Sequence, residues 1–334
     1  PTSSLGEKEV EQLMKTCRDL KARGIGIVFV SHKLEELFEL CDRVEVIRDG
    51  EFIATKPIDQ WDNDSLITAM VGRSLDNQFP KEFGEKSKEP MLEVDNVVEA
   101  GVLNNVSFKA YGGQILGFAG LVGAGRTEIM RAVFGADPID SGKIKIKGKE
   151  VHIKSPRQAI HHGIAFLTED RKGQGLVLAQ TIRTNLILAN MKGFSSGLFL
   201  NEKKILETGE QNIASLRIKT PSIDEIVGQL SGGNQQKVVI GKWVNTDADI
   251  FIFDEPTRGI DVGAKVEVYN VMNSLVKQGK CVIMVSSEMP EILGMSDRVI
   301  VMRGGEVMAE VDRDSEHFNQ EDLMKAAWGG KLDD

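Results

Sequence analysis

The chain has 334 residues and a formal net charge of −9, with an isoelectric point near 5.3. Such an acidic chain lacks the basic face that non-specific nucleic-acid binding requires, so we expect no nucleic-acid partner. No apolar run approaches the ~18–20 residues that cross a bilayer, and a membrane span is not expected. The 3 cysteines are far apart and lack metal-ligand spacing, which indicates reduced thiols in a cytosolic protein.

The first 75 residues are predicted to alternate helices with strands. We expect helices over 7–21 and 34–40, and strands over 26–30 and 43–48. Glu35 and Glu36 are assigned to a solvated face of the second helix. The stretch over 76–90 is charged, weakly apolar and bounded by proline, and is therefore predicted to be a linker.

The rest of the chain, 91–334, is predicted to be an α/β domain. The expected elements are strands over 91–97, 114–118, 164–167, 250–253 and 281–285, a β-rich stretch over 143–153, and helices over 127–134 and 321–327. A mainly helical subdomain is expected over about 181–232. Alternating strands and helices imply a mostly parallel sheet that is covered on both faces.

A glycine-rich turn precedes the helix over 127–134. It fits the P-loop pattern except for Arg where Lys is expected, and its residues are Gly120, Leu121, Val122, Gly123, Ala124, Gly125, Arg126 and Thr127. Backbone N–H groups in such a turn point at an anion, and the helix dipole adds to the attraction. The turn predicts a phosphate site that extends to Glu128, with the Thr127 hydroxyl as a ligand of Mg²⁺.

An acidic pair ends the apolar run over 250–253. Asp254 is predicted to hold the metal through water, and Glu255 to orient the attacking water for in-line phosphoryl transfer. The helix that precedes this strand begins with a second N-terminus that can bind phosphate, the signature, made of Leu230, Ser231, Gly232, Gly233, Asn234 and Gln235. A tight turn and helix-capping acids would explain each element alone, but chance explains the three together poorly.

In this order the three elements resemble the nucleotide-binding domain of ATP-binding cassette (ABC) proteins. The segments 168–172, 254–265 and 285–291 narrow the resemblance to the ATP-binding subunit of bacterial monosaccharide importers of the ribose and galactose type. The resemblance implies a P-loop NTPase fold with a helical subdomain, ATP and Mg²⁺ as cofactors, and a translocase ATPase activity. It also implies a peripheral position on the cytoplasmic face of the inner membrane, two permease subunits as partners, and an indirect connection to a sugar-binding protein.

An internal repeat organises the chain. Residues 1–51 align without a gap with residues 256–306, at an offset of 256 − 1 = 255, and His32 falls opposite Ser287. We therefore expect residues 1–75 to be the C-terminal remnant of a first cassette, 76–90 a linker, and 91–334 a complete second cassette. The chain is expected to be the C-terminal portion of a two-cassette protein.

The resemblance implies composite sites, in which the P-loop of one cassette pairs with the signature of the other. Departures from the family pattern concentrate in the second P-loop site: Arg126 for Lys, Glu169 for the usual Gln, Ser287 for a switch His, and no aromatic residue over 95–106 to stack on adenine. The rigid guanidinium fork is no simple replacement for a compact ammonium. We expect this site to bind nucleotide and hydrolyse it poorly, although Glu255 is retained.

The working site would pair His32, as a contact of the γ-phosphate, with the signature. The 334-residue chain alone is therefore expected to be nearly inactive. Two alternatives stay open: a non-transport tandem ABC ATPase acting on ribosomes or DNA, and a regulatory nucleotide-binding module. The resemblance leaves open which sugar is carried, and whether the permeases form a homodimer or a heterodimer.

Overall fold

The computed structural model describes residues 7–31, 34–48, 50–71, 79–197 and 199–332. His32 lies outside the described residues, so its predicted role is not tested. The chain forms two compact units, one made of Pro1–Gln78 with Gly259–Lys265 and the other of Phe79–Arg258 with Val266–Asp334. Each unit is described by itself.

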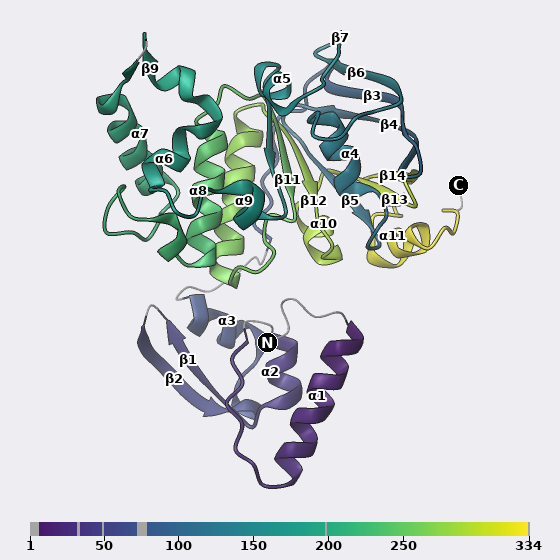
Figure 1. Cartoon of the computed structure of the whole chain (residues 1–334). Coiled ribbons are helices and arrows are strands. Elements are labelled where there is room, and N and C mark those ends of the chain that lie inside the picture. The colour runs from purple at the N-terminus through teal and green to yellow at the C-terminus, as the bar shows by residue number, and fades with distance from the viewer. Residues whose placement is uncertain (1–6, 32–33, 49, 72–78, 198, 333–334) are drawn as a thin grey trace. The chain divides into compact units, whose positions relative to one another are not determined.

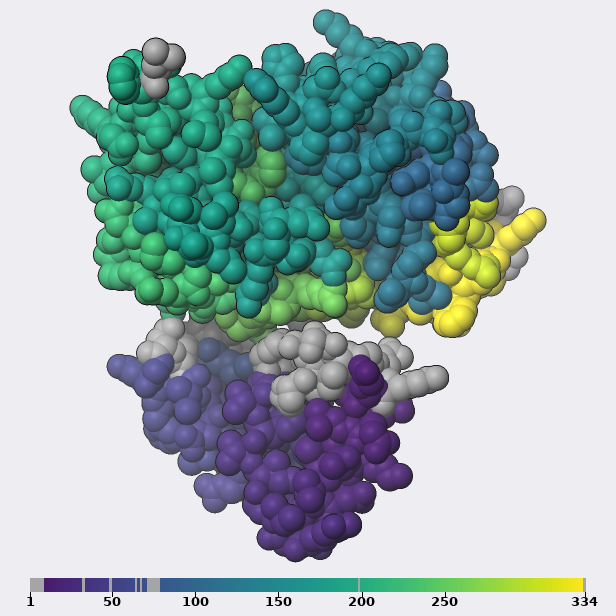
Figure 2. All heavy atoms as spheres, in the orientation of Figure 1, coloured from purple at the N-terminus to yellow at the C-terminus, as the bar shows by residue number. Residues whose placement is uncertain are grey.

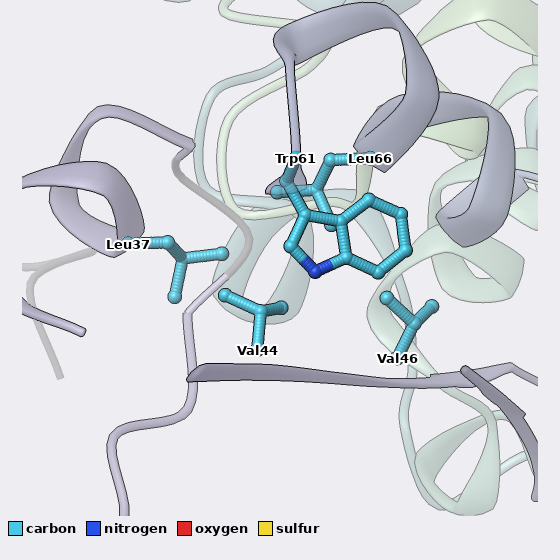
Figure 3. Close-up of a cluster of buried hydrophobic side chains, with 5 residues drawn as sticks. All are labelled: Leu37, Val44, Val46, Trp61 and Leu66. Atoms are coloured by element: carbon cyan, nitrogen blue, oxygen red, sulfur yellow. The ribbon is translucent and has the colours of Figure 1, made fainter. Parts of the chain in front are cut away.

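The first unit combines helices with a two-stranded sheet (Figure 1). Its elements are α1 (Glu7–Ala22), α2 (Leu34–Leu40), β1 (Arg43–Arg48), β2 (Glu51–Pro57), the short 3₁₀ helix η1 (Ile58–Gln60) and α3 (Asn63–Val71). Strands β1 and β2 pair antiparallel. The core is a cluster of buried side chains around an indole ring, namely Leu37, Val44, Val46, Trp61 and Leu66 (Figure 3).

The strand predicted over 26–30 is not formed, and this prediction is wrong. Residues 25–31 carry no regular secondary structure, and Val28 and Val30 are 94% and 80% exposed. The repeat matches this segment to Cys281–Val285, which forms a buried strand between two parallel neighbours in the second unit. The described part of the first unit has no such neighbours, so the backbone groups of residues 26–30 have no ladder to join.

The second unit is built on a six-stranded sheet. Its strands are β5 (Ile115–Gly120), β8 (Ile164–Leu167), β11 (Ile250–Asp254), β12 (Cys281–Val285), β13 (Arg298–Arg303) and β14 (Glu306–Asp312). They lie in the order β14-β13-β5-β12-β11-β8, and all neighbours are parallel except β13 and β14. Strands β8, β11 and β12 are buried along their whole length, as expected for strands covered on both faces.

A second, antiparallel sheet packs beside the first. It has the order β4-β3-β6-β7, with β3 at Pro90–Glu99, β4 at Leu103–Tyr111, β6 at Ser141–Ile146 and β7 at Lys149–Val151. Helix α4 (Arg126–Val133) contacts both β4 and β5, so it lies between the two sheets. The remaining helices of the core are α5 (Pro156–His161), α9 (Val262–Lys277), α10 (Met289–Met295) and α11 (Gln320–Ala327).

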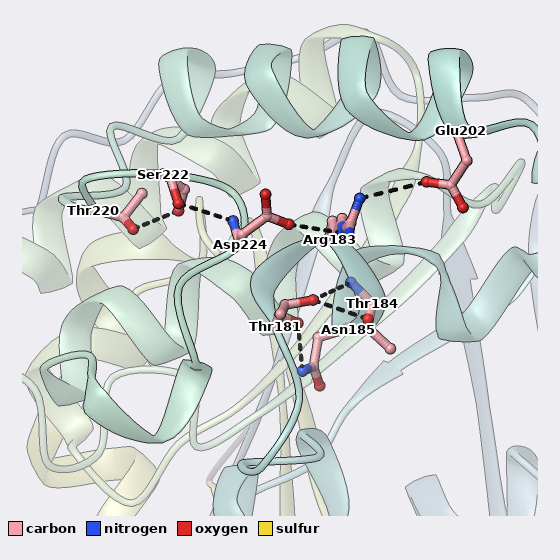
Figure 4. Close-up of polar contacts among 8 residues, drawn as sticks. All are labelled: Thr181, Arg183, Thr184, Asn185, Glu202, Thr220, Ser222 and Asp224. Atoms are coloured by element: carbon pink, nitrogen blue, oxygen red, sulfur yellow. Dashed lines mark hydrogen bonds and ion pairs between the residues drawn. The ribbon is translucent and has the colours of Figure 1, made fainter.

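A mainly helical subdomain interrupts the core. It contains α6 (Ile182–Ile187), the 3₁₀ segment η3 (Leu188–Phe194), a short hairpin of β9 (Ser195–Ser196) and β10 (Phe199–Leu200), and α7 (Glu202–Ser215), followed by η4 (Val227–Gln229) and α8 (Gly232–Val244). Thr181 caps α6, and Arg183 joins Glu202 to Asp224 at 3.4 and 2.8 Å (Figure 4). These pairs connect α6 to α7 and to the loop before the signature. In Figure 2 the subdomain and the antiparallel sheet form opposite sides of the visible face of this unit.

The predicted linker differs from the structure from Phe79 onward, because this segment is part of the second unit. Lys81 Nζ lies 2.7 Å from Asp297 Oδ2, and both side chains are nearly buried. The Phe79 ring packs on Tyr269 of α9 at 5.7 Å between centroids. Asn273 of α9 accepts the backbone N–H of Glu82 at 3.2 Å. Residues 79–87 thus form a strap that packs on the core of the second unit. Of the predicted linker 76–90, residues 76–78 lie outside the described residues.

Candidate nucleotide-binding site

The glycine-rich turn links β5 to α4 and has the backbone that a phosphate loop needs. Gly120, Gly123 and Gly125 have φ of +152°, +77° and +97°, backbone angles that residues with a Cβ atom rarely adopt. A Cβ at Gly120 would also lie 2.4 Å from the carbonyl oxygen of Met302. Helix α4 begins directly after Gly125, so the N–H groups of its first turn have no partner within the helix.

The other turn residues shape the loop. Ala124 donates its N–H to Leu121 O at 3.0 Å and accepts the N–H of Gly305 at 2.9 Å, which ties the loop to the end of β13. Val122 is 96% exposed at the tip of the turn. Glu128 stands half-buried in the first turn of α4. The predicted loop residues are therefore brought together at one end of the parallel sheet.

Thr127 and Asp254 meet across this end of the sheet. The Thr127 hydroxyl donates to Asp254 Oδ1 at 3.2 Å, and Asp254 is 1% exposed. Burial raises the pKa of Asp254 to about 7, and the charges of Glu255 and Glu128 act in the same direction. The second oxygen, Oδ2, is buried and has no hydrogen-bond partner among the described residues. A buried, half-satisfied carboxylate beside a hydroxyl fits a hard cation that takes oxygen ligands.

Glu255 follows Asp254 with a strained backbone, at φ +47°. Its Oε2 accepts the Ser287 hydroxyl at 3.0 Å, and its N–H donates to Val285 O at 2.9 Å. Burial raises the pKa of Glu255, while the Ser287 hydrogen bonds and the charge of Arg126 oppose the shift. The structure thus places two of the predicted residues, Glu255 and Ser287, in direct contact.

Arg126 points into the site rather than into solvent. Its Nη1 donates to the carbonyl oxygen of Ser286 at 2.6 Å, and its Nη2 lies 3.9 Å from Glu255 Oε1. The residue is only 8% exposed. The guanidinium therefore lies between the acidic strand end of β11 and the segment that follows β12.

Glu169 stands where the family pattern has Gln, and it adds a negative charge there. In the structure its carboxylate forms an ion pair with Arg258, which follows the acidic strand end. Arg171 donates to the carbonyl oxygen of Arg258 at 3.0 Å. The substitution of Glu for Gln is thus paired with a cation on the facing segment, a partner that pattern matching missed.

The signature residues open α8. Ser231 is the N-cap residue, and its exposed hydroxyl accepts Asn234 Nδ2 at 3.0 Å. Gly232 and Gly233 form the first helical positions, where the N–H groups have no intrahelical partner. Gln235 is 4% exposed and donates to the carbonyl oxygen of Leu230 at 3.2 Å. Gln235 therefore shapes the loop, while Ser231 and the two glycines present a hydroxyl and backbone N–H groups at the helix start, the kind of group that binds anions.

Sequence reasoning missed one buried residue of the first unit. Glu36 was assigned to a solvated helix face, and the structure corrects this, because Glu36 is 6% exposed and accepts the Ser31 hydroxyl at 2.7 Å. The repeat contained the signal, since Glu36 aligns with the equally buried Glu291.

A parallel sheet with a glycine-rich turn at its carboxyl end, and a buried acid facing the helix hydroxyl, defines a P-loop nucleotide-binding protein. Residues 103–258 match the family model described as ABC transporter. The second unit therefore belongs to the ABC transporter family.

Solved cassettes share this fold. One is the ADP conformation of MJ1267, described as an ATP-binding cassette of an ABC transporter, with a TM-score of 0.60 and 21% identity over 72% of this chain and 96% of that chain. Another is the ATP-binding cassette MJ0796 bound to ADP and Pi, with a TM-score of 0.59 and 19% identity over 67% of this chain and all of that one.

Curated relatives are much more similar in sequence. The chain is 47% identical over 330 residues to a ribose import ATP-binding protein of Geobacillus kaustophilus, covering 99% of this chain and 66% of that protein. It is 45% identical to a putative ribose/galactose/methyl galactoside import ATP-binding protein of Rhizobium etli, covering 99% of this chain and 62% of that protein. The chain thus spans about two thirds of the length of the curated relatives it matches. No helix among the described residues is both long and apolar enough to cross a membrane.

Proposed function

We propose that this chain is part of an ATP-binding and ATP-hydrolysing subunit that powers import of a simple sugar, of the ribose or galactose type, through a membrane permease. One observation carries the proposal: identity of 45–47% along about 99% of the chain with proteins named for this function. The partners would be two permease subunits, with an indirect connection to a sugar-binding protein. The subunit would lie on the cytoplasmic face of the inner membrane.

ATP and Mg²⁺ are the cofactors that the site residues fit. The glycine-rich turn and the start of α4 would hold the phosphates. Thr127 and Asp254 would hold Mg²⁺, which supplies charge neutralisation at the phosphates when bound. Glu255 has the buried position and the hydroxyl contact that suit a group orienting water.

We further propose that the second cassette binds ATP but hydrolyses it poorly. Arg126 is engaged with Ser286 O and Glu255, so its charge is directed at the carboxylate as well as at the phosphate position. Ser287 cannot take over the imidazole chemistry of a histidine. Hydrolysis would belong to a second site, to which His32 and a further P-loop and acidic strand end would contribute.

Affinity purification from membranes tests the transport proposal. We expect the tagged protein to recover permease subunits from detergent extracts of cells grown on ribose or galactose. Recovery with ribosomes or DNA would instead support the alternative tandem ATPase.

Calorimetry tests the nucleotide site itself. The chain should bind Mg-ATP, and Thr127→Val should lose the part of the affinity that depends on Mg²⁺. Thr220→Val, a matched change in the helical subdomain, should bind as the unchanged chain does, because the Thr220 hydroxyl donates to Ser222 O in its own loop at 2.8 Å.

A further inference from the structure

A buried carboxylate lies behind the site and connects three separate elements. Glu291 of α10 is 1% exposed. Its Oε1 accepts the Thr257 hydroxyl at 2.8 Å, and its Oε2 accepts the Ser286 hydroxyl. The hydroxyl of Tyr269, on α9, also interacts with this carboxylate. Because a buried carboxylate is costly unless it is hydrogen-bonded, these hydroxyls are held tightly around it.

Ser286 is held from two sides. Its hydroxyl bonds to Glu291, while its carbonyl oxygen accepts Arg126 Nη1 at 2.6 Å. The next residue, Ser287, donates its hydroxyl to Glu255. The position of the segment 286–287 against the acidic strand end therefore depends on the Glu291 carboxylate behind it.

The first unit repeats this contact. Ser31 Oγ donates to Glu36 Oε2 at 2.7 Å, and both residues stand at the offset of the repeat, since 286 − 31 = 291 − 36 = 255. The two units differ in the residue that follows the serine, His32 in one and Ser287 in the other. The serine–glutamate contact is thus kept where the neighbouring switch residue has changed, which indicates a role in placing that segment.

We propose that Glu291 is a positioning residue that sets the segment 286–287 at the γ-phosphate end of the nucleotide site, and that Glu36 holds Ser31 in the same way. The inference rests on the proposed function, because it presumes that the site binds ATP. Glu291 touches no phosphate itself and acts through Ser286. Loss of the Glu291 carboxylate should therefore weaken the binding of ATP, which has a γ-phosphate, more than the binding of ADP, which lacks one.

Two single-hydroxyl variants of the 334-residue chain test this. Ser286→Ala and Tyr269→Phe each remove one hydroxyl that interacts with the same carboxylate, but only Ser286 lies in the positioned segment. Calorimetric titration with Mg-ATP and Mg-ADP should show that Ser286→Ala weakens the binding of ATP about five- to tenfold more than the binding of ADP. This is the effect expected from losing one hydrogen bond. Tyr269→Phe should keep the ratio of the two dissociation constants within about twofold.

Glu291→Gln keeps the side-chain volume and should shift the ratio in the same direction as Ser286→Ala. An unchanged ratio in Ser286→Ala, or an equal shift in Tyr269→Phe, overturns the positioning role while the unchanged chain still binds both nucleotides. Failure of the unchanged chain to bind either nucleotide overturns the proposed function instead, and the inference with it.

Discussion

Arg126 Nη2 lies 3.9 Å from Glu255 Oε1, and both side chains are 9% exposed. The cation of the phosphate loop is thus engaged with the carboxylate that would orient water. A bound nucleotide has to share the Arg126 guanidinium with Glu255. A lysine at this position would have a single ammonium group and would lack the second nitrogen, Nη1, that donates to Ser286 O. This relationship gives a physical reason for the weak hydrolysis that we propose at a site that retains its acidic residue.

A double-mutant cycle measures this pairing. Arg126→Met leaves Glu255 buried without its cation, and Glu255→Gln removes the charge from the other side. We expect a coupling of about 1–2 kcal/mol in the free energy of unfolding, as for residues in one polar network. Denaturant unfolding of the unchanged chain, the two single variants and the double variant gives this quantity. Additive effects would mean that the two groups do not interact.

The strap over 79–87 should contribute to stability through Lys81. Lys81→Met leaves Asp297 without its cation in a nearly buried position, and breaking such a pair destabilises by about 3–5 kcal/mol. Lys203→Met removes an exposed partner of Glu207 and should change stability by less than about 0.5 kcal/mol. Urea unfolding of the two variants makes the comparison. Similar midpoints would show that the segment behaves as a free linker.

Lys242 should give stability a distinct pH dependence. Burial lowers its pKa to about 8, and its Nζ donates to Gly175 O at 2.6 Å. Above pH 8 the folded state loses this proton before the unfolded state does, so the free energy of unfolding should rise from pH 8 to about 10.5 and stay constant below 8. A shift of this size corresponds to about 3 kcal/mol.

Lys242→Met provides the reference for this rise. Other groups titrate in the same range in both proteins, so the difference between the two stability curves isolates Lys242. A flat difference between pH 7 and 10 would mean that the ammonium is not desolvated in the folded chain.

The two proposed sites should respond unequally in a longer protein that contains this chain together with a first P-loop. His32→Ala should lower sugar-stimulated ATP hydrolysis by about 10²–10³-fold, the usual effect of losing one catalytic contact. Glu255→Gln should be much milder, because it alters the site that carries Arg126. Steady-state hydrolysis with permease and sugar-loaded binding protein makes the comparison. Equal losses would show that both sites hydrolyse ATP.

Much of the second unit was predictable because its signals are local. Gly120, Gly123 and Gly125 need backbone angles that few residues adopt, and the apolar run before Asp254 is long enough to identify a strand covered on both faces. The glycine-rich turn and the acidic pair Asp254 and Glu255 followed from these two patterns. The same local patterns therefore predicted both the secondary structure and the residues of the candidate site.

Three of the misses depended on partners far away in the chain. Lys81 looks like a linker charge until its contact with Asp297, 216 residues away, is known. Residues 26–30 have strand-like composition, but a strand needs neighbours, and the described part of the first unit supplies none. The ion pair of Glu169 with Arg258 joins two loops whose approach is set by the sheet order, which composition does not encode.

The fate of bound ATP tests the central claim most directly. The 334-residue chain is incubated with radiolabelled Mg-ATP, separated from free nucleotide, and its bound nucleotide is identified over time. We predict that ATP is retained and remains intact for many minutes, because Arg126, Glu169 and Ser287 leave the site able to bind but poorly able to hydrolyse. Conversion of the bound ATP to ADP within seconds, or the absence of any bound nucleotide, would contradict this account.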